Sequence, residues 1–202
     1  MGASERTQRL LELLPASRGA GRYLQRDYWA VIDQCRVRPS ELMQTVRERF
    51  GEFSPAELAR FEREPGETGP LRGGEELWVH IPLTPRCAVR VVHTDAQSLT
   101  LATLPGHPEA GRITFGAYRN ARGDVVFHIR SRARSGSRAM FAGFLAVGES
   151  MQTNTWTDFV STVASTFGSG LIGPIHAETQ RLARRTATAE DPSAPTFRAE
   201  GD

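Results

Sequence analysis

The fold of this 202-residue chain is decided by residues 88–131, AVRVVHTDAQSLTLATLPGHPEAGRITFGAYRNARGDVVFHIRS. Apolar and polar side chains alternate there over residues 88–93, 98–104, 112–118 and 125–131. Alternation with a period of two is typical of β-strands that bury one face. The connections between these runs are short and contain turn-forming residues. They leave no room for crossover helices, so the runs are predicted to be antiparallel neighbours in one sheet.

The residues upstream add a strand and two helices to this pattern. A fifth alternating run covers residues 77–83, and residues 28–37 are predicted to form the first strand. Pro39 is expected to open a helix after that strand. Ser54 is expected to cap a second helix that ends at Pro65.

Downstream of the sheet the periodicity becomes helical. An apolar stripe at helical spacing predicts a late helix, and its members are Trp156, Phe159, Val160, Val163 and Phe167. A last helix is predicted over residues 174–185. This order of elements predicts an α+β helix-grip fold, in which a curved antiparallel sheet wraps around a C-terminal helix. A cavity between sheet and helix is expected in such a layout.

Three regions are expected along the chain. Residues 1–21 form an N-terminal extension, residues 22–185 the helix-grip domain, and residues 186–202 a tail. The tail is rich in Thr, Ala, Pro and acidic residues, which bury little apolar surface, so it is predicted to be disordered.

Composition argues against several classes of function. The 25 basic residues are all arginine, and 23 acidic residues bring the net charge to +2. Basic residues alternate with acidic ones and form no broad patch, so we expect no nucleic-acid partner. No apolar run reaches the roughly 18 residues of a spanning helix, so no membrane span is expected. Two distant cysteines and no recognisable signal peptide make the cytoplasm the expected location.

Metal and cofactor motifs are also not recognisable. His80, His93, His107, His128 and Glu109 do not fall into an HxxxH or HExxH spacing, and no nucleotide-binding fingerprint occurs. We therefore expect no metal and no cofactor. Cys87 with His93 is the pair that a nucleophilic mechanism could combine, but no motif singles the two out.

Strand alternation predicts which side chains face the cavity. The apolar candidates, including three from the late helix, are Val79, Ile81, Val91, Leu101, Phe115, Phe127, Trp156, Phe159 and Val163. The polar candidates are His93, His107, Glu109 and Arg130. The alternative for the apolar set is that it simply fills the core, which is the commoner fate of such residues. His93 is either a base or donor in the pocket or, as we favour, a cap on the turn before Asp95.

The most distinctive segment is the loop TLPGHPEAG, residues 103–111, which its prolines stiffen. With the strand CAVRVV, residues 87–92, it resembles the family called domain of unknown function 1990, whose pattern contains "CRVV" and "GTLPGHPE". Ala102 stands at that family's first glycine, Arg112 and Ile113 replace an acidic pair, and Ser135 replaces a proline. The family is similar to START and polyketide-cyclase-like proteins. The resemblance therefore implies a helix-grip fold and no established activity.

Three functional hypotheses follow from these patterns. The leading one is a START-like domain that binds a hydrophobic small molecule, lipid or polyketide-like, in the cavity. The second is a cyclase-like enzyme on a polyketide-type substrate, with His93 or His107 as its base. The third is a protein-interaction module that uses the outer sheet face around Trp78, which an exposed apolar patch would favour.

Overall fold

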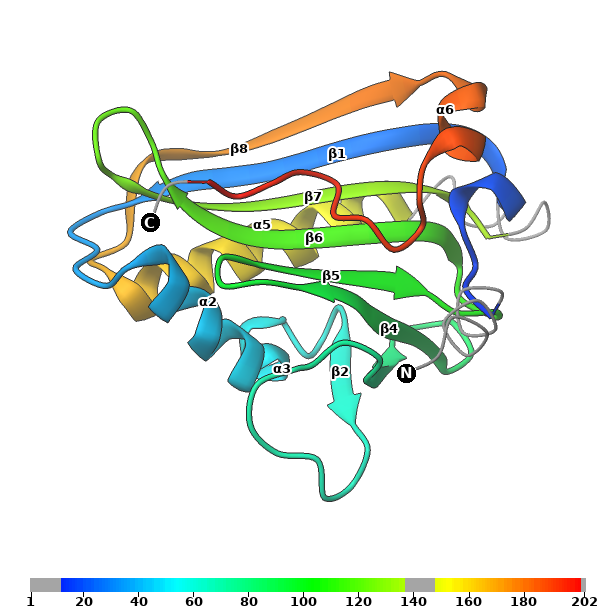
Figure 1. Ribbon diagram of the computed structural model, residues 1–202, viewed down its shortest axis with the longest axis horizontal. Coiled ribbons are helices and arrows are strands. Elements are labelled where there is room, and N and C mark those ends of the chain that lie inside the picture. The colour runs from blue at the N-terminus through cyan, green and yellow to red at the C-terminus, as the bar shows by residue number, and fades with distance from the viewer. Residues whose placement is uncertain (1–11, 137–147, 201–202) are drawn as a thin grey trace.

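A computed structural model describes residues 12–136 and 148–200 of the chain. In these residues one antiparallel sheet has the strand order β2-β3-β4-β5-β6-β7-β1-β8 (Figure 1). The strands are β1 (Ala20–Ile32), β2 (Arg60–Arg63), β3 (Glu76–His80), β4 (Cys87–Thr94), β5 (Ser98–Thr103), β6 (Glu109–Arg119), β7 (Val125–Ser135) and β8 (Leu171–Leu182). The helical elements are η1 (Ala16–Arg18), α2 (Pro39–Glu48), α3 (Phe50–Phe53), α5 (Gly148–Phe167) and α6 (Arg184–Ala189).

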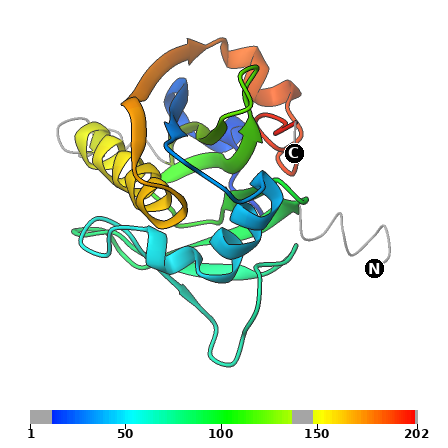
Figure 2. The same cartoon turned by 90° about the vertical axis from the view of Figure 1, so that its left-hand side faces the viewer.

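The sheet curves around α5, which lies on its concave side (Figure 2). The apolar stripe of α5 is buried there, with Phe159, Val160 and Val163 at most 1% exposed. The Phe159 ring stacks on Phe127 of β7 at 5.9 Å and packs against Phe115 of β6 at 5.2 Å, both between ring centroids. The predicted α+β helix-grip fold is therefore confirmed.

Two predicted helices are wrong. Ser54 does not cap a helix, because its hydroxyl donates to the Ala59 carbonyl at 2.6 Å and closes a turn before β2. Phe61 then pairs with Val79 as part of the sheet. The second wrong helix is that over residues 174–185, most of which form β8 and pair antiparallel with β1. The pairing provides hydrogen-bond partners for the backbone groups of β1. The local sequence of residues 174–185 gives no indication that β1 needs these partners.

The first strand also begins earlier than expected. β1 starts at Ala20 and ends at Ile32, whereas the alternation suggested residues 28–37. Part of the predicted N-terminal extension is thus integral to the sheet. Leu13 is buried, and the Leu14 amide donates to the Thr103 carbonyl at 2.8 Å.

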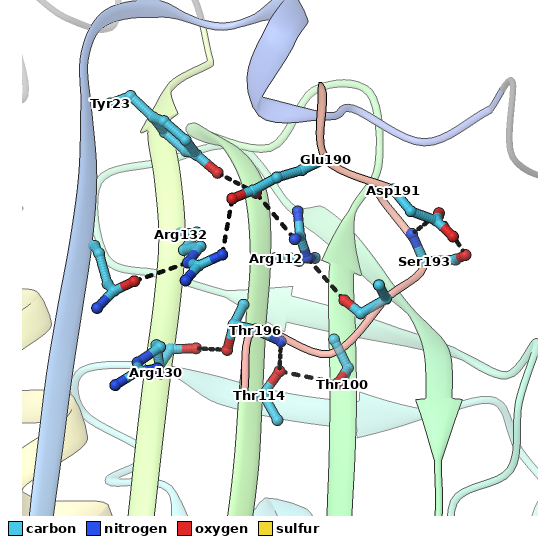
Figure 3. Close-up of polar contacts among 12 residues, drawn as sticks. Tyr23, Thr100, Arg112, Thr114, Arg130, Arg132, Glu190, Asp191, Ser193 and Thr196 are labelled. Atoms are coloured by element: carbon cyan, nitrogen blue, oxygen red, sulfur yellow. Dashed lines mark hydrogen bonds and ion pairs between the residues drawn. The ribbon is translucent and has the colours of Figure 1, made fainter. Parts of the chain in front are cut away.

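Residues 186–200, expected to be a disordered tail, form contacts with the rest of the fold. After α6 the chain runs along the outer face of the sheet, over β7 and β6 (Figure 1). The Glu190 carboxylate accepts from Tyr23 at 2.5 Å and pairs with Arg132 at 2.8 Å and Arg112 at 2.9 Å (Figure 3). Thr196 donates its amide to Thr114 and its hydroxyl to the Arg130 carbonyl. The arginines that the alternation places on the outer face thereby receive a carboxylate from the tail.

Within the described residues, no helix is both long and apolar enough to cross a membrane.

Replacing Glu190 tests whether this ion-pair cluster holds the tail. Glu190→Gln leaves the Arg112 guanidinium, which is 7% exposed, without its carboxylate. Uncompensated buried charge is costly, so we expect the free energy of unfolding to fall by about 2–3 kcal/mol in urea denaturation. We also expect faster amide exchange at Thr196. Glu200→Gln, at an exposed position near the chain end, is the control. Equal stability of the two variants would contradict the prediction.

Candidate functional site

A cavity of about 90 Å³ lies between the inner face of the sheet and α5. Its wall is mostly apolar and includes Phe61, Val79, Ile81, Leu101 and Trp156. Thr103, His107, Glu109 and Ser131 give it a polar end at the loop between β5 and β6. The cavity thus combines a greasy body with a few fixed polar groups, as small-molecule sites do.

The structure places six of the thirteen predicted site residues in the cavity wall. These six are Val79, Ile81, Leu101, His107, Glu109 and Trp156. Five others do not line it and pack in the main hydrophobic core: Val91, Phe115, Phe127, Phe159 and Val163. These five residues fill the hydrophobic core, which was the alternative expected for the apolar candidates. The remaining two, His93 and Arg130, lie elsewhere.

His93 lies outside the cavity because of a β-bulge. The register between β4 and β5 shifts after Val91, so that His93 pairs with Thr100 and loses the inward parity of Val91. Its Nε2 contacts the Asp95 carboxylate at 2.9 Å. The favoured interpretation, a cap on the turn before Asp95, agrees with this geometry.

Arg130 is on the outer face of the sheet. Its Nε donates to Asp27 Oδ1 at 2.5 Å, and the same carboxylate contacts His128 at 2.7 Å and accepts from Gln25 at 2.9 Å. Burial raises the pKa of Asp27, but the hydrogen bonds from His128 and Arg130 outweigh it and hold that pKa below its usual range. Phe197 of the tail stacks on the His128 ring at 4.4 Å. This cluster fastens β1, β7 and the tail together.

The backbone of Glu109 holds the His107 ring in the cavity wall. The loop turns at Gly106, whose φ of +92° suits glycine, and this turn brings both the amide nitrogen and the carbonyl oxygen of Glu109 to 3.0 Å from His107 Nδ1. Burial lowers the pKa of His107 to about 4, which keeps the imidazole neutral at pH 7.

A close approach between β6 and β7 supports the loop from below. Gly111 has a φ of +155°, and a Cβ on it would clash with the Arg132 carbonyl oxygen and the Ala133 backbone. Its amide donates to the Thr103 hydroxyl at 3.0 Å. Only glycine fits this position. Gly111 therefore anchors the end of the loop that carries His107 and Glu109.

Several residues at this end of the cavity were not among the predicted site residues. Arg26 of β1 pairs across the sheet with Ser131, which lines the cavity, and its Nη1 lies 3.5 Å from Glu109 Oε1. Extending the alternation of Tyr28 and Ala30 two residues upstream would have placed Arg26 on the inner face. Phe61 has no such signal, because the N-cap pattern at Ser54 predicts a helix over its segment.

Cys87 and His93 do not form a nucleophilic pair. Cys87 faces the core, its thiol donates to the Val79 carbonyl at 3.6 Å, and burial raises its pKa to about 11. The bulge after Val91 turns His93 to the opposite face. In the part of the chain that the structure describes, no three His, Cys, Asp or Glu side chains gather as a metal site would require.

The outer face around Trp78 carries polar contacts. The indole Nε1 donates to Glu64 at 2.6 Å, and the Arg86 guanidinium lies 4.3 Å above the ring. Trp78 also packs on a small cluster that includes Leu13 and Ala88. These contacts differ from the exposed apolar patch that an interaction module at Trp78 would need.

Gly111→Ala tests the close approach. A Cβ would collide with backbone that cannot move without breaking the β6–β7 ladder, so we expect a loss of about 3 kcal/mol in the free energy of unfolding. Gly106→Ala is the matched control, because Gly106 also has positive φ but nothing lies within 4 Å of its Cβ position. It should cost about 1 kcal/mol. Equal losses in chemical denaturation would contradict this assignment.

The pH dependence of stability tests the buried His107. With a folded pKa of about 4 and a usual value of 6.5, the unfolded chain binds more protons than the native protein between these two pH values. Stability from this group is therefore lost as pH falls from 6.5 toward 4. Removing the titration with His107→Asn should reduce that acid loss by about 3 kcal/mol in urea denaturation series. Parallel curves for the two proteins would show that His107 is not buried in its neutral form.

Comparison with known structures places the fold among very distant relatives. The KanY protein, solved by NMR, has a TM-score of 0.52 at 7% identity, covering 73% of this chain and 99% of that protein. Hypothetical protein jhp0584 from Helicobacter pylori has a TM-score of 0.50 at 8% identity, with coverages of 70% and 86%. Major latex-like protein 151 from Panax ginseng has a TM-score of 0.47 at 11% identity, with coverages of 73% and 99%. At such identities the likeness to KanY and jhp0584 concerns the fold alone.

Sequence comparison identifies the family. No curated protein matches the sequence. A family profile, described as a domain of unknown function, matches residues 38–161, from the start of α2 into α5. This match includes the loop that carries His107 and Glu109 and leaves out β1, β8 and the tail. Because it spans more than half of the chain, the protein belongs to the DUF1990 family.

Proposed function

We propose that the protein binds a small hydrophobic molecule in the cavity between the inner sheet face and α5. The observation that carries this proposal is an apolar cavity with a buried, neutral imidazole at one end. A void in a protein core is unfavourable, because the atoms around it lose van der Waals contacts. An unfilled space at this position therefore supports a binding role.

The volume of the cavity limits the size of the ligand. At about 90 Å³ it is smaller than the roughly 300–1,000 Å³ of pockets for drug-sized ligands. It is also smaller than the engineered cavity of about 150 Å³ that binds benzene. The proposed occupant is accordingly a compound smaller than benzene, or one end of a larger lipid or polyketide-like molecule.

Binding is better supported than the cyclase alternative. A general base must reach the substrate with a nitrogen that accepts a proton, and the Glu109 backbone already engages His107 Nδ1. A pKa of about 4 also makes this imidazole a weak base. His93, the other candidate base, lies outside the cavity wall. Location in the cytoplasm stays a prediction that cell fractionation would test.

Filling the cavity should abolish binding. Xenon is a suitable probe because it is apolar, uncharged and smaller than benzene. We expect it to shift the methyl NMR signals of Val79 and Leu101 in the wild-type protein and not in Ile81→Trp. Leu83→Trp, on an exposed loop residue near Ile81 in sequence, is the matched control and should retain binding. Probe binding that persists in Ile81→Trp, or is missing from the wild type, would refute the proposed site.

Native mass spectrometry of protein isolated from its host would identify the natural occupant. We expect an apolar adduct of low mass. A bare chain mass that is unchanged after exposure to host lipid extract would count against the proposal.

A further inference from the structure

A polar groove lies on the outer face of the sheet, on the side opposite the apolar cavity. Its volume is about 580 Å³, within the roughly 300–1,000 Å³ of small-molecule sites. Strands β1, β6, β7 and β8 line it, and the lining includes Asp27, Trp29, Tyr118, Arg130 and Glu178. No residue lines both this groove and the cavity next to α5. The groove is therefore a separate candidate site.

Arg130 presents unused hydrogen-bond donors to this groove. Its Nε donates to Asp27 Oδ1 at 2.5 Å, and its guanidinium carbon lies over the Phe197 ring, 5.5 Å from the centroid. Within residues 12–136 and 148–200, neither Nη nitrogen of Arg130 donates a hydrogen bond. Paired guanidinium N–H groups match the two oxygens of a carboxylate. The free end of Arg130 therefore suits an anionic group.

Glu178 supplies the opposite charge. It pairs with Asp27 across the β1–β8 ladder, so both carboxyl groups project from the same face of the sheet. Burial opposes ionisation of Asp27, but the hydrogen bonds from His128 and Arg130 keep its pKa below the usual range. Like charges directly opposite on neighbouring strands are destabilising, and in the described part of the chain Glu178 has no ion pair or hydrogen bond. A cation beside Glu178 would relieve this repulsion.

We propose that the outer groove binds a zwitterionic amino acid with an apolar side chain. Its carboxylate accepts hydrogen bonds from the Nη nitrogens of Arg130, and its ammonium pairs with Glu178. These two residues flank Asp27 in one row across β7, β1 and β8 (Figure 1), which separates their Cα atoms by about 10 Å. A ligand with one charge would satisfy one of them and meet a like charge at the other. Trp29 and Tyr118 add aromatic surface to the same groove.

Three ligands of similar shape separate the two charges. At pH 7 L-phenylalanine carries both, 2-phenylethylamine carries only the ammonium, and 3-phenylpropanoate carries only the carboxylate. Dissociation constants can be measured by NMR titration, with the indole N–H signal of Trp29 as the reporter of the groove. We expect phenylalanine to bind the wild type at least about fivefold more tightly than either singly charged compound.

Two variants remove one recognition group each. Glu178→Gln changes an exposed side chain and should weaken phenylalanine binding about threefold to fivefold, without weakening 3-phenylpropanoate binding. Arg130→Lys keeps a positive charge for Asp27 and removes the paired Nη donors. It should weaken binding of phenylalanine and 3-phenylpropanoate about fivefold and leave 2-phenylethylamine unaffected. Glu57→Gln, at an exposed position outside the groove, makes the same change in net charge as Glu178→Gln and should bind phenylalanine like the wild type.

Several results would overturn the proposal. They are an absence of phenylalanine binding to the wild type, equal affinity for phenylalanine and a singly charged compound, and full affinity in Glu178→Gln. The ligand series on the wild type and Glu178→Gln decide the question even if Arg130→Lys does not fold. Xenon binding to the cavity should be the same in Glu178→Gln as in the wild type, so the proposed function stands or falls separately.

Discussion

The packing of Phe159 from α5 against the inner face of the sheet is the contact on which the rest of the structure depends. Its ring lies within 6.3 Å, centroid to centroid, of five other aromatic rings, which belong to Phe50, Phe53, Phe115, Phe127 and Trp156. These rings come from α3, from two strands and from α5 itself. These ring contacts hold α5 and α3 against the inner face of β6 and β7. The cavity begins where this aromatic packing ends, beyond Trp156.

The two faces of the sheet are stabilised by different interactions. The inner face buries apolar residues against α5. The outer face carries arginines at alternate positions of β7, and each needs a partner because the tail covers it. Arg132 forms an ion pair with Glu190 and donates a hydrogen bond to Gln25, and Arg130 forms an ion pair with Asp27. The terminal segment is ordered by these charge-assisted hydrogen bonds and by Phe197, which fills the space left by Gly116. Its composition predicted disorder, because amino-acid composition carries no information about the partners that the sheet supplies.

The loop of residues 104–108 shows how backbone geometry sets side-chain chemistry. A glycine that admits positive φ lets the chain turn, and the turn brings the Glu109 amide to one nitrogen of His107. The Glu109 carbonyl oxygen lies at the same distance from this nitrogen, so the backbone of one residue holds the ring in place. Burial keeps the ring neutral over the physiological pH range. The outcome is a fixed, uncharged imidazole in an apolar wall.

The strands β3 to β7, the late helix and the helix-grip class could be predicted from the amino-acid sequence alone. All of these depend on local periodicity or on a short motif, and both are set by residues that are close together in the sequence. The tertiary structure decided the rest. β8 forms because β1 offers an open edge to pair with, whereas the sequence of residues 174–185 predicted a helix. His93 leaves the inner face because of one bulge against β5, and a single inserted residue reverses the parity of every side chain after it. Arg26 meets Glu109, and Glu190 meets Arg112, across more than 75 residues of chain, and contacts over such separations depend on sheet register and not on sequence spacing.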